Sequence, residues 1–176
     1  KDILKRAGIK KVTLDTLDWA GQETYIKKLK VKKPYMLIVP GCDPTRLEKR
    51  WPAEYYAELA THIASKKIQP VIIGTKDEAR EAKIIQDACP QALSLIGKTS
   101  LFDIPALARG AVGAVGNDTG PMHMIGPTGC KSLVLFSHAS DPEKHAPVGK
   151  HVYVFREKNL EDINPETVLK TIGGWF

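Results

Sequence analysis

The sequence lacks the features of a membrane protein, a disulfide-bonded protein or a metalloprotein. No apolar run approaches the ~18 residues of a membrane-spanning helix, and the first residues lack the apolar stretch of a signal peptide. The three cysteines, Cys42, Cys89 and Cys130, lack the paired spacing of zinc or redox motifs. We therefore expect a soluble, cytoplasmic protein with reduced thiols and no metal.

Several enzyme motifs are also missing. No Gly-x-Gly-x-x-Gly follows the first predicted strand, which disfavours a nicotinamide dehydrogenase. The sequence contains neither a Walker loop nor the Gly-x-Ser-x-Gly elbow of a hydrolase. Its histidines show no metal-ligand spacing. Dehydrogenase, phosphate-loop and serine-hydrolase chemistry are therefore disfavoured.

The positive charge is uneven along the chain. The net charge is +6 at pH 7, and it arises in residues 1–33, which hold ten Lys or Arg and four acids; residues 34–176 hold 16 of each. We therefore expect no nucleic-acid-binding face on the folded part. The N-terminal lysines indicate a solvated linker, and contact with an anionic inner-membrane surface is the alternative.

From Tyr35 onward, short aliphatic runs alternate with helical stretches. This alternation is typical of a parallel sheet covered by helices. We expect strands at 35–39, 70–73, 92–95, 111–115, 132–136 and 151–155. The length and the 43% hydrophobic composition suit one domain. The predicted fold class is α/β, with a doubly wound, Rossmann-like parallel sheet.

Helices are expected between these strands. They should begin near Pro52, after Asp77, near Asp103 as a cap, and at Gly120 or Pro121. A last helix is expected at 165–172 with Asn164 as its cap. Residues 1–33 fit this scheme badly, because no strand leads them, although 22–30 has a helical pattern. We interpret 1–33 as the tail of a preceding domain with its connection, and 34–176 as the domain itself.

The strongest local motif is Gly-Asn-Asp-Thr-Gly-Pro-Met-His at 116–123. It directly follows a predicted strand, and ligands of open α/β sheets bind where strands end. Its glycines let the backbone approach a ligand, and a helix starting at Pro121 would point its positive dipole end outward. We therefore expect an anion site. The alternative is a structural turn capped by Asp118 or Thr119, with His123 packed on the sheet.

Two other loops fall on the same predicted edge. Residues 40–52 bring three cations, Arg46, Lys49 and Arg50, to a helix start, where cations are unfavourable unless an anion binds. The alternative is that the arginines pair with Glu48 or Glu54, while Trp51 packs beneath the loop. Glu78 is either an acid matched to a helix dipole or an acceptor for ribose hydroxyls. Lys98, Thr99 and Ser100 could close the pocket, with Ser100 as an alternative helix cap.

These motifs, in this order, resemble the ADP-heptose:lipopolysaccharide heptosyltransferase family over residues 35–172. The most specific parts are 49–52 (Lys-Arg-Trp-Pro), the Gly74 turn with Glu78, and 118–123. The resemblance implies one half of a GT-B architecture of two Rossmann-like domains: the C-terminal, nucleotide-sugar-binding half. It also implies inverting transfer without metal or cofactor.

The resemblance implies a role for each matching residue. Lys49 would meet the pyrophosphate or the sugar near it, Glu78 the ribose, and Asp118 with its two neighbours the diphosphate and heptose. His123 would support the loop. As a loop lysine, Lys49 should be exposed, so that its removal spares stability. Two residues, Cys42 and Asp43, replace the small hydroxyl residues usual in the family. The full predicted donor site is Cys42, Asp43, Lys49, Glu78, Thr99, Asp118, Thr119, Gly120 and His123.

The resemblance places the general base in an N-terminal domain that precedes this chain. We therefore expect no catalytic residue here, an inactive fragment, ADP-heptose as the donor and a lipid A-core acceptor held by that other domain. The protein would be cytoplasmic and peripheral to the inner membrane. Two alternatives are a non-catalytic Rossmann-type nucleotide-binding module and a GT-B epimerase or transferase that uses a UDP-sugar.

Overall fold

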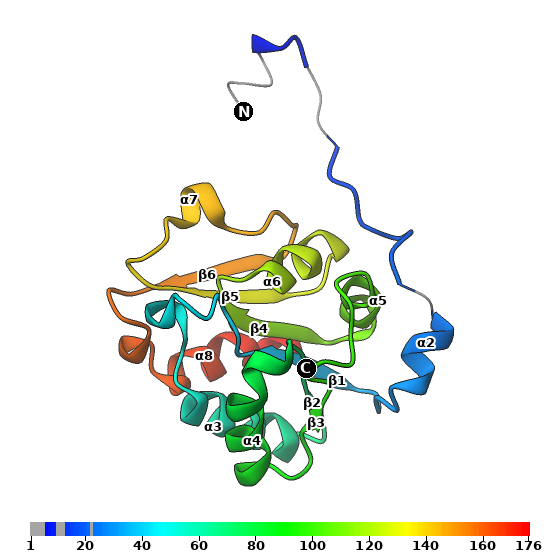
Figure 1. The fold of residues 1–176 in the computed structure, drawn as a ribbon, viewed down its shortest axis with the longest axis vertical. Helices are drawn as coiled ribbons and strands as arrows, with labels where there is room; N and C mark the ends of the chain where they lie inside the picture. The colour runs from blue at the N-terminus through cyan, green and yellow to red at the C-terminus, as the bar shows by residue number, and fades with distance from the viewer. Residues whose placement is uncertain (1–5, 10–12, 22) are drawn as a thin grey trace.

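The fold is one parallel sheet covered by helices on both faces (Figure 1). The computed structural model describes residues 6–9, 13–21 and 23–176. All strand pairs are parallel, and the strand order is β3-β2-β1-β4-β5-β6. The strands are β1 (Tyr35–Val39), β2 (Gln69–Ile72), β3 (Leu93–Ser94), β4 (Gly113–Asn117), β5 (Ser132–Phe136) and β6 (Val152–Arg156). The predicted doubly wound α/β fold is confirmed.

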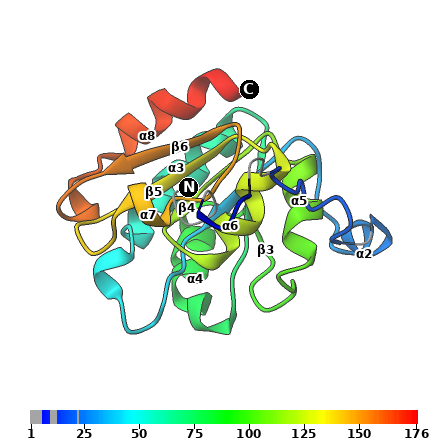
Figure 2. The same ribbon diagram turned by 90° about the horizontal axis from the view of Figure 1, so that it is seen from above.

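The helices divide between the two faces of the sheet (Figures 1 and 2). One face is covered by α3 (Ala53–Ser65), α4 (Ala79–Ala88) and α8 (Pro165–Ile172). The other is covered by α5 (Asp103–Gly110) and α6 (Gly120–Ile125), with α2 (Glu23–Lys28) against α5. A short α7 (Pro142–His145) follows β5, and 3-10 turns lie at η1 (Leu47–Lys49), η2 (Lys76–Glu78), η3 (Gly126–Thr128), η4 (Leu160–Asp162) and η5 (Gly173–Trp175).

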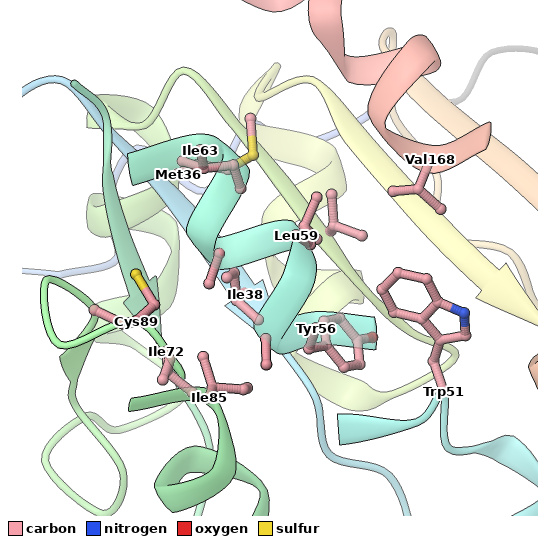
Figure 3. Close-up of a cluster of buried hydrophobic side chains, with 14 of the residues drawn as sticks. Met36, Ile38, Trp51, Tyr56, Leu59, Ile63, Ile72, Ile85, Cys89 and Val168 are labelled. Carbon is pink, nitrogen blue, oxygen red and sulfur yellow. The ribbon is translucent and has the colours of Figure 1, made fainter. Parts of the chain in front are cut away.

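The central strands are aliphatic because they are buried on both faces. Strands β1 and β5 are buried along their whole length, as parallel strands between helix layers must be. Figure 3 shows the core on one face, where Trp51 lies beside Tyr56 and Val168. Trp51 is 1% exposed, and its indole nitrogen donates to the Ile163 carbonyl at 2.9 Å. The prediction that Trp51 packs beneath its loop is therefore confirmed.

The predicted boundaries need small corrections. β4 starts at Gly113 rather than at residue 111, because the amide of Ala111 still bonds the last turn of α5. Asp103 does not cap α5: the N-cap is Phe102. The Asp103 carboxylate instead accepts hydrogen bonds from the amide and hydroxyl of Ser100, at 2.8 and 2.7 Å. Asn164 does cap α8, through a 2.8 Å bond from the Glu166 amide.

The N-terminal segment contacts the domain through α5. The Arg109 guanidinium donates to the carbonyls of Leu17 and Ala20, at 3.0 and 2.7 Å, and Ala20 is buried. The described residues before Leu17 lie away from the sheet (Figure 1). The helix expected at 22–30 ends earlier, since α2 ends at Lys28, while Gln22 lies outside the described residues. Residues 1–5 and 10–12 lie outside the described residues, and the domain division stays a prediction.

The cysteines and the helices give two further observations. All three cysteines are free and buried, and burial raises the pKa of the Cys130 thiol to about 12. The three cysteines thus form no disulfide with one another in the structure. Among the described residues, no helix has the length and apolar character needed to cross a bilayer.

Candidate functional site

The candidate site lies where the strand order reverses. From β1 the chain crosses to β2 on one side of the sheet, and it later returns to β4 on the other side. The loops that leave β1 and β4 therefore run apart and open a crevice at the carboxyl edge. We use this term for the edge where strands end, and amino edge for the edge where they begin. The predicted site loops, after Val39, Ile72, Ser94 and Asn117, all lie at the carboxyl edge.

Asn117, the last residue of β4, holds this crevice together. Its side-chain oxygen accepts hydrogen bonds from the Trp51 amide at 3.1 Å and the Tyr56 hydroxyl at 3.0 Å. Its side-chain nitrogen donates to the Pro40 carbonyl at 2.7 Å. Asn117 is fully buried, so each of these bonds replaces water that cannot enter. One side chain thus fixes the end of β1, the start of α3 and the end of β4.

Lys49 and Asp118 form an ion pair across the crevice. The Lys49 ammonium donates to the Asp118 carboxylate, and the two side chains are only 17% and 8% exposed. Lys49 closes η1, while the Asp118 amide is fixed by the Leu135 carbonyl at 3.1 Å. The expectation that Lys49 is an ordinary exposed lysine is wrong, because Asp118 draws it over the end of the sheet. The pair presents a positioned cation beside a buried carboxylate.

A charged hollow of about 450 Å³ opens above this pair. In addition to Lys49 of the pair, Arg46 brings a positive charge to the lining of this hollow. The first residue of α6, Gly120, faces open space, because no heavy atom lies within 4 Å of a Cβ added there. The Thr119 hydroxyl makes no capping bond to the helix, so it is available to a ligand. The complete lining is Asp43, Arg46, Lys49, Asp118, Thr119, Gly120, His123, Ala139, Ser140 and His145.

A second hollow of about 200 Å³ adjoins the first and shares Asp43 and Thr119 with it. Its floor is the Glu78 side chain, 5% exposed. One Glu78 oxygen accepts from the Thr75 amide and hydroxyl, at 2.7 and 2.9 Å. A Cβ on Gly41 would lie 2.5 Å from the Glu78 carboxyl carbon. Glycine is thus required at 41 for the loop to pass over this buried carboxylate.

The family of the chain is decided by its match to known sequences. The sequence model of glycosyltransferase family 9 (heptosyltransferase) matches residues 7–171. The chain belongs to this family. The lipooligosaccharide heptosyltransferase 2 of Haemophilus influenzae is 24% identical over 188 residues, covering 89% of this chain and 53% of the relative. The lipopolysaccharide heptosyltransferase 2 of Escherichia coli K12 is 26% identical over 168 residues, covering 82% and 47%. The chain thus spans about half the length of these relatives.

Solved structures share the fold. The structure of the E. coli ADP-heptose heptosyltransferase II aligns with a TM-score of 0.76 at 23% identity, covering 94% of this chain and 52% of that one. E. coli heptosyltransferase WaaC with ADP aligns with a TM-score of 0.72 at 22% identity, covering 84% and 47%. The UDP-GlcNAc 2-epimerase of Methanocaldococcus jannaschii aligns with a TM-score of 0.64 at 12% identity, covering 98% and 51%. At these identities the likeness establishes the Rossmann-like fold of GT-B proteins.

In this family 9 chain, most of the predicted donor residues come together. Eight of the nine line one or both hollows. The exception is Thr99, which lies at the same edge but lines neither. The Cys42 thiol donates to the Arg46 carbonyl at 3.1 Å, and burial raises its pKa, so it also braces the loop. Glu78 forms a capping box with Thr75. The alternative in which Glu78 stabilises the start of a helix is therefore confirmed.

Asp43 and the arginines have more specific partners than expected. Hydrogen bonds from the Thr45 hydroxyl and amide lower the pKa of the Asp43 carboxyl. Arg46 pairs with Glu48, as one alternative proposed, at 2.5 Å. Arg50 pairs with neither Glu48 nor Glu54: its partner is Glu81, at 2.7 Å. Of the three cations in this loop, Lys49 is therefore the one that pairs with an acid at the end of β4, Asp118.

Two parts of the site were missed from the sequence. Asn117 stood in the strongest motif without a role, although a buried amide at a strand end is a frequent anchor. The segment after β5 supplies Ser140 and His145 to the charged hollow, and the Arg46 guanidinium ties it down through the Ala139 carbonyl at 3.0 Å. The signal for this segment was topological, because β5 neighbours β4 and ends at the same edge.

Proposed function

We propose that this chain binds the ADP-heptose donor of an inverting heptosyltransferase that extends the lipopolysaccharide inner core. The observation that carries the proposal is the Lys49–Asp118 pair at the reversal point of the sheet, beside the open start of α6. The Lys49 ammonium and the start of α6 both attract negative charge, and Asp118 is the carboxylate already paired with Lys49. A diphosphate has the charge to meet both, while the ribose of a nucleotide has the hydroxyls to meet the neighbouring hollow over Glu78.

Lys49 would act on the leaving group. During transfer, the bond between the anomeric carbon and the β-phosphate oxygen breaks, and negative charge accumulates on ADP. An ammonium held in place by Asp118 can stabilise this charge without reorganising, which lowers the barrier more than a freely moving lysine would. The Thr119 hydroxyl and the Gly120 backbone border the same space, while His123 walls it from the α6 side.

Glu78 would select the ribose. Its Oε2 is bound to Thr75, and no donor among the described residues bonds its Oε1. A carboxylate oxygen in this position accepts hydroxyl hydrogens, and the two hydroxyls of a ribose are the natural donors. The diphosphate and the ribose are adjacent in ADP, as the two hollows are adjacent here. Cys42 and Asp43 border the junction between them.

The rest of the reaction is assigned to a domain outside this chain. The base that removes the acceptor proton, and the surface for the lipid A-core acceptor, would belong to the N-terminal half of a longer protein, peripheral to the inner membrane on its cytoplasmic side. No metal or cofactor enters the proposal. Support for the donor comes from solved relatives, one with ADP and one with ADP-2-deoxy-2-fluoro heptose.

Calorimetric titration with ADP, UDP, ADP-ribose and NAD tests the donor. We expect ADP to bind with a dissociation constant of about 0.1 to 1 mM, because the crevice is open to water, and UDP to bind more weakly. Preference for UDP would favour the epimerase-like alternative, with which the chain shares its fold. Equal binding of NAD would favour a general nucleotide-binding module.

A turnover assay tests the division of labour. The 176-residue chain is incubated with ADP-heptose and a heptose-deficient lipopolysaccharide, and ADP release is followed. We expect none, because positioning of both partners is worth roughly 7 to 11 kcal/mol of barrier in good cases. Turnover of about 1 per second or faster would place the base within this chain, with Asp118 as the first candidate.

A further inference from the structure

The connections at the amino edge of the sheet carry charge of one sign, and Asp87, in the last turn of α4 at the same edge, is paired with Lys83. Six connections enter strands at this edge, at 29–34, 66–68, 89–92, 111–112, 129–131 and 146–151, all within the described residues. They contain no Asp or Glu, and they carry seven lysines: Lys30, Lys32, Lys33, Lys66, Lys67, Lys131 and Lys150. The last turns of α2 and α5 add Lys27, Lys28 and Arg109. We call this set the basic edge.

The basic edge has no internal counter-charge. Among the residues that the structure describes, none of its cations forms an ion pair with a carboxylate. Arg109, the cation with the most hydrogen bonds, donates to two neutral carbonyls. The nearest acids on the N-terminal segment, Asp15 and Asp18, accept hydrogen bonds from that segment itself. The positive potential of this edge is therefore directed to solvent.

Helix dipoles explain only part of this charge. Helices end at the amino edge, and their negative dipole ends favour a cation in the last turn, which accounts for Arg109 and Lys66. The effect falls off within about one turn. Lys33, Lys131 and Lys150 lie beyond that range, several residues past the preceding α-helix. Helix dipoles therefore do not explain these three lysines. Their positive charge indicates an anionic partner outside the chain.

Two hollows on this edge combine cations with apolar floors. One, of about 330 Å³ between α2 and α5, places Lys27, Lys33 and Arg109 around Ile26 and Val31. The other, of about 590 Å³, shares Lys33 and adds Lys32 and Lys67 around Ile68 and Pro90. Neither lining contains an acid. Phosphate groups attached to apolar chains match this pairing of charge and apolar surface.

We propose that the basic edge is a docking surface for an anionic lipid bilayer. Lysines attract the phosphates of a charged leaflet while their stems cover apolar surface. Val148, next to this cluster at 66% exposure, adds an apolar contact of the kind that interfacial segments use. A nucleic acid fits less well, because Tyr35, the aromatic of the first hollow, is buried with its hydroxyl bonded to Leu107 and cannot stack on a base.

This inference rests on the proposed function for the inner membrane as the surface that the protein meets, but it does not depend on the identity of the donor. The donor crevice lies at the carboxyl edge, so a bilayer on the basic edge leaves it open to the aqueous phase, where a nucleotide sugar dissolves. The N-terminal lysines that the sequence assigned to a solvated linker become part of a larger surface. The other lysines of that surface lie within residues 34–176, which have no net charge as a whole. They are Lys66, Lys67, Lys131 and Lys150.

Vesicle sedimentation with the 176-residue chain tests the surface. Vesicles of phosphatidylcholine mixed with phosphatidylglycerol are compared with phosphatidylcholine alone, at low and high NaCl. The test variant is Lys33→Glu with Lys67→Glu. The matched control, Arg80→Glu with Lys158→Glu, lowers the net charge equally but at exposed positions next to the carboxyl edge. Circular dichroism checks that both variants fold.

We expect the unaltered chain to bind the anionic vesicles, to release them at high salt and to ignore the neutral ones. The test variant should lose at least about tenfold in binding, since each lysine near such a leaflet contributes about 1 kcal/mol, while the control should bind within about twofold of the unaltered chain. Equal loss in both variants would overturn the proposal, as would salt-insensitive or absent binding. The same variants are also titrated with a single-stranded RNA. If the unaltered chain binds this RNA but no vesicle, and the test variant loses RNA binding, the edge is assigned to nucleic acid instead.

Discussion

The two edges of the sheet differ in how their charged residues are arranged. At the carboxyl edge, acids and cations meet: Lys49 with Asp118, Arg46 with Glu48, and Arg50 with Glu81. At the amino edge, the connections carry seven lysines and no acid, and Asp87 at the end of α4 is paired with Lys83. Residues 34–176 carry no net charge, so neutrality by count hides a strong separation in space. Positive and negative charges that cancel along the sequence are therefore concentrated at different edges of the fold.

Helix dipoles provide the baseline for this comparison. Helices start at the carboxyl edge and end at the amino edge, so acids are favoured at the first and cations at the second. Departures from the baseline point to ligands. Lys49 and Arg46 depart from it at the carboxyl edge, where Asp118 and Glu48 are their partners and the charged hollow beside them is open to a further anion. The basic edge exceeds what dipoles need, and the excess points to a large anionic partner.

The largest effect should come from the anchor of the carboxyl edge. Asn117→Ala leaves the Trp51 amide and the Pro40 carbonyl without partners in a dry interior, and it leaves the Tyr56 hydroxyl only its 3.4 Å bond to the Val39 carbonyl. The expected cost is about 3 kcal/mol in unfolding free energy. Urea denaturation measures it. The control is Asn159→Ala, whose exposed capping box should cost about 1 kcal/mol. A loss at Asn117 no greater than the control would remove its anchoring role.

The next effect concerns the pair that distinguishes the carboxyl edge. Lys49→Ala should weaken ADP binding roughly ten- to hundred-fold, the value of a charge-assisted hydrogen bond of about 1.5 to 3 kcal/mol. It should also lower the melting temperature, because the Asp118 carboxylate is left buried and unpaired. Calorimetry and thermal unfolding measure both changes.

A double variant separates the two roles of Lys49. Adding Asp118→Asn removes the unpaired charge, so the melting temperature should recover while ADP binding stays weak. Normal ADP binding by Lys49→Ala would show that Lys49 stabilises the fold and does not bind the nucleotide. The ion pair would then be no evidence for a ligand site at the carboxyl edge.

A smaller effect is expected where the crevice is open. Gly120→Ala points a methyl group into the charged hollow without touching protein atoms. Stability should be unchanged, whereas ADP affinity should fall about tenfold, roughly the cost of one misplaced methyl in a binding pocket. The matched change Gly41→Ala should instead destabilise the fold through its contact with Glu78. Unaltered ADP affinity in Gly120→Ala would place the diphosphate elsewhere.

The smallest effect should come from the opposite edge. Lys33→Glu with Lys67→Glu should change ADP affinity by less than about twofold, since a strand of five residues spans ~17 Å and charges are screened beyond about 8 Å at physiological salt. Calorimetry at that salt concentration is the measurement. A larger change would mean that the two edges act as one electrostatic unit.

Much of this organisation was predictable from local patterns. The aliphatic run at 35–39 and the turn residues after it indicated a strand and its loop, and the same logic placed four loops on one edge. Partners distant in sequence were not predictable. The contacts of Arg50 with Glu81 and of Lys49 with Asp118 depend on how α4 and β4 pack beside the β1 loop. Asn117 could be located in a motif, but its bonds require the three segments it joins.

The amino edge was missed for the same reason. Its lysines are scattered through six short connections, and only the parallel topology gathers them. A count by sequence segment assigned the charge to the first 33 residues, because the later lysines are balanced there by acids of the other edge.

The most direct test of the account is a map of backbone amide shifts in the 176-residue chain as ADP is added. The account predicts that the largest shifts fall at 41–49, 74–78 and 116–123, and that the connections of the basic edge stay unchanged. The same shifts should be much reduced in Lys49→Ala at equal ADP concentration. Largest shifts at the amino edge, or an unchanged map in Lys49→Ala, would contradict the assignment of the nucleotide site to the Lys49–Asp118 crevice.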